Sequence, residues 1–212
     1  MTNPILYGPQ FSTYVRSARL ALAEKGVAYD LEEIDMFAGA HKDAAHLARH
    51  PFGKVPVFEH EGFILYETCA ILRYVDEAFQ GPRLQPGDPG GRARMTQIIS
   101  VIDCYAYRPM IPGIVIPRFV AARSKKKPDE AAIDAAVPEA AEALTVLESL
   151  FVGEFLAGKA LSLADLHLAP IHDYFRQTPE GESLLSGAPK LSRWWSTMSR
   201  RPSMQETTPS FA

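Results

Sequence analysis

Apolar positions in the first eighty residues recur sometimes at every second residue and sometimes three or four residues apart. The first spacing predicts strands, and the second predicts helices that bury one face. A polar and only partly helical stretch at 36–50 interrupts the pattern. The predicted elements are strands at 5–7 and 29–34, a hairpin of strands 55–58 and 63–66 joined through 59–62, and helices at 12–25 and 67–79. This order predicts a mixed sheet with helices packed on it.

The pattern changes after residue 80. Residues 80–91 are dense in glycine and proline, which is typical of a linker between domains. Beyond the linker only the helical spacing occurs, and Pro112 and Pro117 predict a break or kink within a longer helix. Predicted helices cover 93–107, 129–150 and 162–175, with a broken pair at 183–198. We therefore predict an α/β domain at 1–80 and an all-α domain at 90–212.

Composition narrows the class of protein. The 212 residues are 47% hydrophobic and 22% charged, the balance of a globular protein with a sizeable core. A net charge of -3 argues against a nucleic-acid partner held by charge, and the basic run at 123–127 predicts a solvated loop. No stretch approaches 18 apolar residues, and the N-terminus lacks a basic, apolar leader. Neither a membrane span nor a secretory signal is therefore expected.

The spacing of the cysteines and histidines predicts neither a disulfide nor a metal site. Cys69 and Cys104 are the two cysteines, and both lie in apolar periodic stretches; Cys69, on the inner face of a predicted helix, is expected to serve packing. Without a secretory signal they predict reduced thiols and a cytoplasmic protein. His167 and His172 are five residues apart, so they do not share a helix face as a pair of metal ligands would. No metal is expected.

Two short segments predict a place to hold a small peptide. In the run at 51–57, extended Val55 precedes Pro56, which leaves backbone groups at Lys54 and Val55 available to a ligand. Ten residues later, Glu67 and Thr68 stand where a strand gives way to a helix. A helix start stabilises negative charge, whether the charge belongs to its own side chains or to a bound carboxylate.

Several segments in order then resemble the cytosolic glutathione transferases. They are 12–25, the pair His41 and Lys42, the run 51–57, and the pair Glu67 and Thr68, followed by the linker and the helical remainder. The resemblance covers essentially the whole chain and is greatest to the phi class and related bacterial enzymes of the serine type. It implies a thioredoxin-like first domain, an all-helical second domain, glutathione as co-substrate and a homodimer.

The resemblance implies a role for each residue of the two segments. Pro56 is expected in the cis form, with the Val55 backbone pairing with the cysteinyl backbone of glutathione as one strand adds to another. Glu67 and Thr68 are expected to bind the γ-glutamyl end. His41 and Lys42 match the pair that meets the glycyl carboxylate. Lys54 stands where relatives usually carry glutamine, and it can reach a carboxylate as a point charge.

Ser12 is the predicted catalytic residue. On its position alone, between a strand and a helix, it would be an N-cap serine. The resemblance implies in addition that its hydroxyl donates to the glutathione thiolate, the reactive form of the thiol. Tyr7 is a weaker candidate, since it lies one residue before the position of the tyrosine-type enzymes and faces the other way. Tyr14 is a further alternative, and the absence of a cysteine at this turn argues against disulfide exchange.

The second domain is expected to supply the pocket for the electrophile. By resemblance, its candidate residues are Tyr107, Met110, Ile111 and Ile114, together with Phe11 from the first domain. Asp103 is a candidate contact to the glutathione amine across a dimer interface. The motif at 162–165 predicts a helix capping box without chemistry.

Two other functions are compatible with the same residues. One is another glutathione-dependent reaction on this fold, such as dehalogenation, isomerisation or peroxide reduction. The other is a non-catalytic binding protein that has kept the site. The presence of Ser12, Val55, Pro56, Glu67 and Thr68 favours an enzyme.

Overall fold

A computed structural model describes residues 3–209, and these residues form two compact units. The first unit runs up to Leu84 and includes the segment from Arg200 onward, whereas the second covers Gln85–Ser199. The predicted division at residues 80–90 therefore needs one correction. The C-terminal segment belongs with the first unit, because its side-chain partners lie on helix α1.

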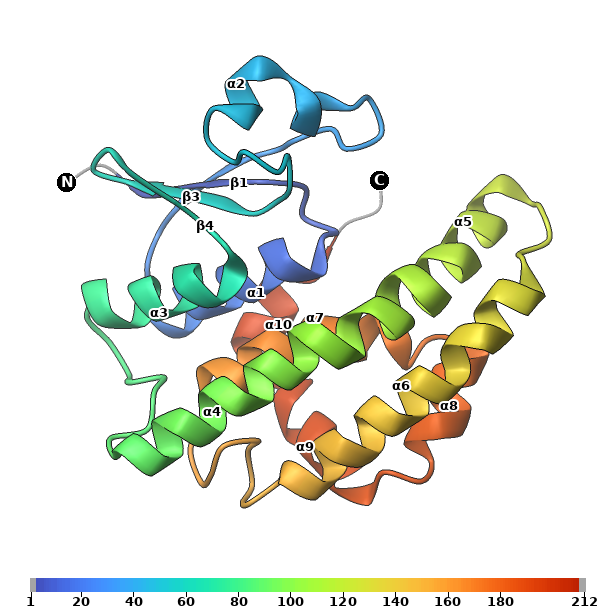
Figure 1. Ribbon diagram of the computed structural model, residues 1–212. Coiled ribbons are helices and arrows are strands. Elements are labelled where there is room, and N and C mark those ends of the chain that lie inside the picture. Colours follow the sequence, from blue (N-terminus) through green and yellow to red (C-terminus); the bar gives the residue numbers. More distant parts are fainter. Residues whose placement is uncertain (1–2, 210–212) are drawn as a thin grey trace. The chain divides into compact units, whose positions relative to one another are not determined.

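The first unit is a four-stranded sheet with helices on both faces. Its strands lie in the order β2-β1-β3-β4, with β1 parallel to β2 and antiparallel to β3. Figure 1 shows α1 and α3 on one face of the sheet and α2 on the other. The elements are β1 (Ile5–Tyr7), α1 (Thr13–Glu24), β2 (Asp30–Glu32), the 3-10 helix η1 (Ala40–Lys42), α2 (Ala44–Leu47), β3 (Val57–His60), β4 (Phe63–Tyr66), α3 (Thr68–Ala78) and α10 (Pro202–Glu206). The predicted mixed sheet and thioredoxin-like first domain are confirmed.

The register of the strands brings four chain segments to one edge of the sheet. Tyr7, the last residue of β1, pairs with Glu32 at the end of β2 and with Val57 at the start of β3. Val57 in turn pairs with Tyr66, the last residue of β4. The segments that follow β1, β2 and β4 and the segment that precedes β3 therefore all leave the sheet at the same edge. These four segments carry the predicted glutathione contacts of the first domain.

The hairpin is tighter than predicted. Strand β3 begins at Val57 rather than at Val55, because Pro56 has no N–H to give to the ladder. It extends to His60, so the turn is the two residues Glu61 and Gly62 rather than four. Their φ values of 51° and 80° are those of the two-residue turn whose twist suits a hairpin.

Two buried arginines bind the C-terminal segment to α1. Arg16 donates to the carbonyl of Met204 at 3.1 Å, and Arg19 donates to the carbonyl of Thr207 at 3.2 Å. At the other end of α1, Glu24 accepts from Arg201 at 2.6 and 2.7 Å. The helical spacing of α1 could not reveal these partners, because they lie about 180 residues away.

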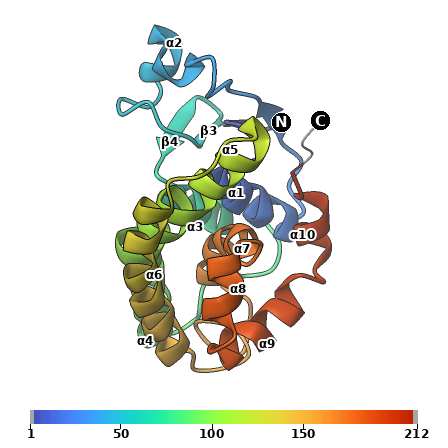
Figure 2. The same ribbon diagram turned by 90° about the vertical axis from the view of Figure 1, so that its right-hand side faces the viewer.

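The second unit is all helical, as predicted. Its elements are α4 (Pro89–Val101), the π-helical turns η2 (Ile102–Ala106) and η3 (Pro109–Val115), α5 (Ile116–Ser124), α6 (Glu130–Leu150), α7 (Leu163–Phe175), α8 (Pro179–Leu185) and α9 (Pro189–Met198). Helix α7 is buried over most of its length and packs against α4, η3 and α8, the last of which lies directly below it in Figure 2. The predicted capping box is present, since Asp165 accepts from Ser162 N–H at 2.8 Å. Asp165 also accepts from the indole of Trp194 at 2.8 Å, which ties α9 to this helix start.

The predicted break at Pro112 is absent. One helix runs from Pro89 to Ser124 without a break at Pro112 or Pro117. It widens into the π-helical segments η2 and η3, and η3 contains Pro112, which has no backbone donor. Among the described residues, only this helix is long and apolar enough to cross a membrane by length and composition. Half of its most apolar window is buried inside the protein, as in a core helix.

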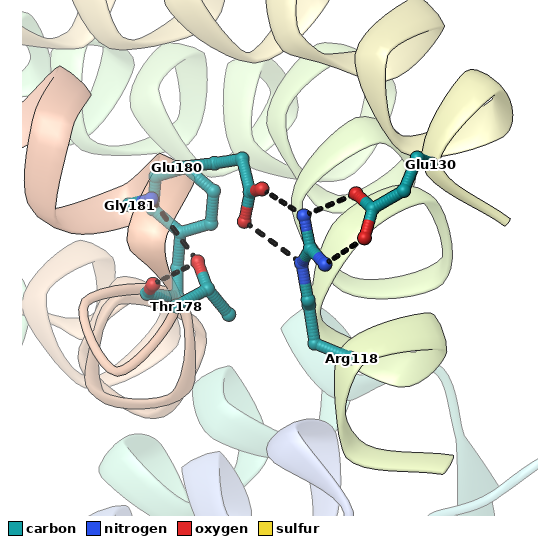
Figure 3. Close-up of polar contacts among 6 residues, drawn as sticks. Arg118, Glu130, Thr178, Glu180 and Gly181 are labelled. Atoms are coloured by element: carbon teal, nitrogen blue, oxygen red, sulfur yellow. Dashed lines mark hydrogen bonds and ion pairs between the residues drawn. The ribbon is translucent and has the colours of Figure 1, made fainter. Parts of the chain in front are cut away.

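Arg118 joins three helices of the second unit. Its guanidinium donates to both carboxylate oxygens of Glu130 at 2.8 and 2.7 Å and to both oxygens of Glu180 (Figure 3). Glu180 is largely buried, with 12% of its side chain exposed, whereas Glu130 is 60% exposed. The hydrogen bonds from Arg118 hold the pKa of Glu180 below its usual value. Beside them, Thr178 caps α8 by accepting from Gly181 N–H at 3.0 Å.

Candidate functional site

Ser12 occupies the N-cap of α1, at the edge where the four segments meet. Its backbone is extended, with φ -67° and ψ 130°, and its Oγ accepts from Val15 N–H at 3.4 Å. The hydroxyl proton has no acceptor among the described residues of this unit. Ser12 is therefore a helix cap whose proton can still be given to a ligand.

The turn before Ser12 packs closely against the segment that precedes β3. Gly8 has φ +143°, and a Cβ at this position would lie 2.5 Å from Val15 Cγ2 and 3.1 Å from Val55 Cβ. A side chain at position 8 would therefore disrupt the turn. This close approach brings the backbone around Ser12 next to Val55.

The Tyr7 side chain has partners of its own in Glu59 and Arg49. Its hydroxyl donates to Glu59 Oε2 at 3.0 Å, and the Arg49 guanidinium lies over its ring, 4.5 Å from the centroid. Burial and the bond to Glu59 raise the pKa of Tyr7 above its usual value. Tyr14 lies in the first turn of α1 and is half-buried. The Tyr7 hydroxyl is thus bound to Glu59, and the catalytic role of Ser12 stays a prediction.

The segment before β3 presents an open backbone donor. The Val55–Pro56 peptide bond is cis, as the resemblance implied, and Pro56 is buried. Within residues 3–209, no group accepts a hydrogen bond from Val55 N–H. The Lys54 side chain is exposed and forms neither a hydrogen bond nor an ion pair with the described residues. A ligand backbone can therefore pair with Val55 without displacing a protein contact.

The start of α3 combines an acid with open helix donors. Glu67 has φ 71° and ψ 114°, an uncommon backbone conformation for a residue other than glycine. Its carboxylate is exposed and has no hydrogen-bond partner in the described part of the chain. Thr68, the first helical residue, is buried. An ammonium group suits the carboxylate and a ligand carboxylate suits the helix start, so the pair matches the amino-acid end of a γ-glutamyl peptide.

His41 and Lys42 lie on η1, in the segment that follows β2. Lys42 Nζ donates to the carbonyl of Phe52 at 3.3 Å, so the structure brings this predicted cation to the loop before Val55. Gly53 permits the approach, because it has φ +57° and a Cβ there would lie 2.7 Å from the His41 carbonyl. His41 is half-buried, and its Nδ1 has no partner among the described residues.

An aromatic pair beside Ser12 includes one residue that the sequence analysis missed. The rings of Phe11 and Phe37 are 5.6 Å apart, and Phe37 is 77% exposed. Phe37 is the one Phe, Tyr or Trp in the polar stretch at 36–50, and this isolated position could have indicated it from the sequence. The pair gives this edge of the first unit an apolar surface.

The predicted residues of the second unit lie on the long helix Pro89–Ser124. Met110, Ile111 and Ile114 are buried, and Tyr107 is half-buried. Asp103 is partly exposed and accepts from His167 Nε2 at 2.7 Å. Their part in an electrophile pocket stays a prediction. In the range 3–209, no three His, Cys, Asp or Glu side chains gather as metal ligands would.

Known proteins resemble this chain along nearly its whole length. The family "Glutathione S-transferase, N-terminal domain" matches residues 4–77, and "Glutathione S-transferase, C-terminal domain" matches 107–202. Glutathione S-transferase F9 of Arabidopsis thaliana is 33% identical over 211 residues, which cover 98% of this chain and 97% of that protein. Glutathione S-transferase 4 of Zea mays is 34% identical and covers 93% and 88%.

Solved structures give the same result. The structure of glutathione transferase F7 from Populus trichocarpa superposes with a TM-score of 0.85 at 32% identity, covering 96% of this chain and 97% of that one. A glutathione S-transferase-I structure bound with lactoylglutathione has a TM-score of 0.84 at 28% identity, covering 97% and 98%.

Proposed function

The chain belongs to the glutathione S-transferase family, and we propose that it conjugates the thiolate of glutathione to small apolar electrophiles. The observation that carries this proposal is the shared sheet edge of the first unit. The strand register gathers Ser12, Val55 and the pair Glu67 and Thr68 there, although they are spread over 57 positions of the chain. Each offers a group that a γ-glutamyl tripeptide needs.

Glutathione would lie along this edge in an extended conformation. The γ-glutamyl ammonium meets the Glu67 carboxylate, and the neighbouring carboxylate meets Thr68 and the start of α3. The cysteinyl backbone pairs with Val55, as in strand addition. The glycyl carboxylate extends toward His41 and Lys42, with Lys54 close enough in sequence to add a second positive charge. The open donor at Val55 and the unpaired Glu67 carboxylate support this orientation.

Ser12 would activate the thiol. Its hydroxyl donates a hydrogen bond to the sulfur, and the start of α1 adds a favourable dipole. Both stabilise the thiolate, so the thiol releases its proton to solvent at a lower pH. The thiolate then attacks the electrophilic carbon and a C–S bond forms. The electron pair of the broken bond leaves with a displaced halide, or moves to the oxygen of an epoxide or enone, and the product of addition then takes a proton from solvent. One charge-assisted hydrogen bond contributes about 1.5–3 kcal/mol, which corresponds to about one to two pKa units.

The electrophile would lie against apolar side chains. We assign the wall of its pocket to Phe11, Tyr107, Met110, Ile111 and Ile114. Asp103 would serve a neighbouring subunit of a homodimer by meeting the glutathione ammonium. The chain would act in the cytoplasm, where glutathione keeps thiols reduced.

Calorimetry and a conjugation assay test the proposal together. Glutathione should bind the purified protein at millimolar concentration or below, and at least one class in a panel of aryl halides, enones and epoxides should yield a stable thioether. Glu67→Gln should weaken binding by about tenfold, since it removes the charge that meets the ammonium. Glu61→Gln, at the exposed hairpin turn, is the matched control. Absence of glutathione binding would refute the proposal, and halide release without a thioether would favour a dehalogenase.

A further inference from the structure

His46 forms a hydrogen bond with the backbone of the segment that carries Val55. It lies on α2, its side chain is buried with 2% exposure, and its Nε2 lies 2.8 Å from the carbonyl oxygen of Lys54. A carbonyl oxygen can only accept, so Nε2 carries the hydrogen and His46 is the donor. Its other ring nitrogen, Nδ1, is buried and has no partner among residues 3–209.

This hydrogen bond restrains the Lys54–Val55 peptide group, whose C=O and N–H point in opposite directions. The Lys54 carbonyl and the Val55 N–H belong to one planar peptide unit, and the cis bond of this segment is the next one, Val55–Pro56. In a planar trans peptide the C=O and N–H point in opposite directions. When His46 holds the carbonyl on one side, the Val55 N–H must point to the other.

Other contacts of the loop do not act on this peptide. Lys42 Nζ donates to the Phe52 carbonyl, and Gly53 N–H donates to the His50 carbonyl at 2.8 Å. Both stabilise the turn before Lys54, and neither involves the C=O or the N–H of the Lys54–Val55 peptide. In the described part of the chain, the bond from His46 is the hydrogen bond that restrains that plane.

We propose that His46 is a positioning residue for glutathione, which it serves by aiming the Val55 N–H at the cysteinyl carbonyl. The inference rests on the proposed function and adds a residue that does not touch the ligand. If the Val55 N–H is held in place before glutathione binds, less conformational entropy is lost on binding. The affinity for glutathione therefore rises without a further contact.

A matched pair of variants separates this role from simple packing. Gln and Met have side chains of similar length, and only Gln carries an N–H that can replace Nε2–H. His46→Met should raise the glutathione KM and Kd about 3- to 10-fold with kcat within about twofold, the loss of roughly one hydrogen bond. His46→Gln should stay within about twofold of the native protein. His50→Phe is the packing control, since His50 is also buried in this loop and its ring lies 4.6 Å from that of Tyr66.

A second ligand distinguishes positioning from general damage. γ-Glutamylcysteamine keeps the γ-glutamyl end and the thiol but lacks the cysteinyl carbonyl that Val55 would meet. His46→Met should bind it as tightly as the native protein does. The inference is overturned if His46→Met weakens the binding of both ligands equally. It is also overturned if the Gln and Met variants bind glutathione with the same Kd, or if the Met variant binds it as tightly as the native protein does. If the Met variant does not fold, His46→Asn, polar but shorter, takes its place. If the native protein binds no glutathione, the proposed function itself fails.

Discussion

His172 should make the helical unit sensitive to mild acid. It is buried in α7 with 5% exposure, and neither ring nitrogen has a hydrogen-bond partner among residues 3–209. Its ring packs against Trp194 and Trp195, with centroids 5.3 and 4.7 Å away. Burial, and to a lesser extent the positive charge of Arg176, lowers the pKa of His172 to about 3. Replacement of His172 by Phe removes the titrating group and keeps a ring of similar size.

The expected size of the effect follows from the two pKa values. In the unfolded chain a histidine titrates near pH 6.5, so between about pH 6.5 and 3 the unfolded state binds a proton that the folded state does not. The stability from this residue is therefore complete above pH 6.5, and within the range it falls by about 1.4 kcal/mol for each pH unit. Between pH 6.5 and 5 the native protein should lose about 2 kcal/mol through this residue. The Phe variant should lose none of this, and at neutral pH it should be at least as stable, because two unpaired buried nitrogens are removed.

Urea unfolding at about pH 7.5 and pH 5 measures the difference. The only two tryptophans, Trp194 and Trp195, lie beside His172, so their fluorescence reports on this unit. His50→Phe is the control, because burial also lowers the pKa of His50 but the residue lies in the first unit. The reasoning is refuted if His172→Phe loses as much stability between the two pH values as the native protein.

Three further outcomes are expected. Glu180→Gln should lower stability by about 1 kcal/mol and Glu130→Gln by less, since only Glu180 is largely buried in its pair with Arg118. The cost of Glu180→Gln should vanish as the pH falls through the lowered pKa of Glu180, and urea titrations that show equal costs at pH 7 and pH 3 would contradict this. Lys54→Gln should reduce the dependence of glutathione affinity on salt, and parallel salt curves in calorimetry would exclude a role for its charge. A chain ended at residue 199 should melt more than about 5 °C lower, because the buried arginines of α1 lose their carbonyl partners, and an unchanged Tm would show that these bonds are dispensable.

Local signals in the sequence were sufficient for much of the fold. Strand β4 and helix α7 lie where the apolar spacing put them, and the capping box at Ser162 follows from two residues three positions apart. The resemblance to the glutathione transferases, and to their phi class, is confirmed by the relatives and by the solved structures.

The features that the sequence missed depend on distant partners. Arg16 and Arg19 look like polar interruptions of an apolar helix face, and their hydrogen bonds to carbonyls of the C-terminal segment compensate for their burial. Pro112 predicts a break when its helix is considered alone. Packing against α6 and α7 accommodates it in a π-helical turn instead.

The residues of the candidate site also differ in whether local sequence signals predict them. Ser12 and the pair Glu67 and Thr68 stand at helix starts, which a sequence can indicate. The bond from His46 to the Lys54 carbonyl joins a side chain to the backbone of another segment. No residue type or spacing marks such a contact in advance.

Titration of the glutathione thiol in its complex with the protein tests the role of Ser12 most directly. The ultraviolet absorbance of the thiolate gives its pKa in the native protein and in Ser12→Ala. Asp129→Ala removes a helix cap in the other unit, where Asp129 accepts from Ala132 N–H at 3.1 Å, and it controls for the loss of a cap alone. The thiol pKa should lie well below that of free glutathione in the native protein and in Asp129→Ala, and it should rise by about one to two units in Ser12→Ala. The same thiol pKa in all three proteins would contradict activation by Ser12.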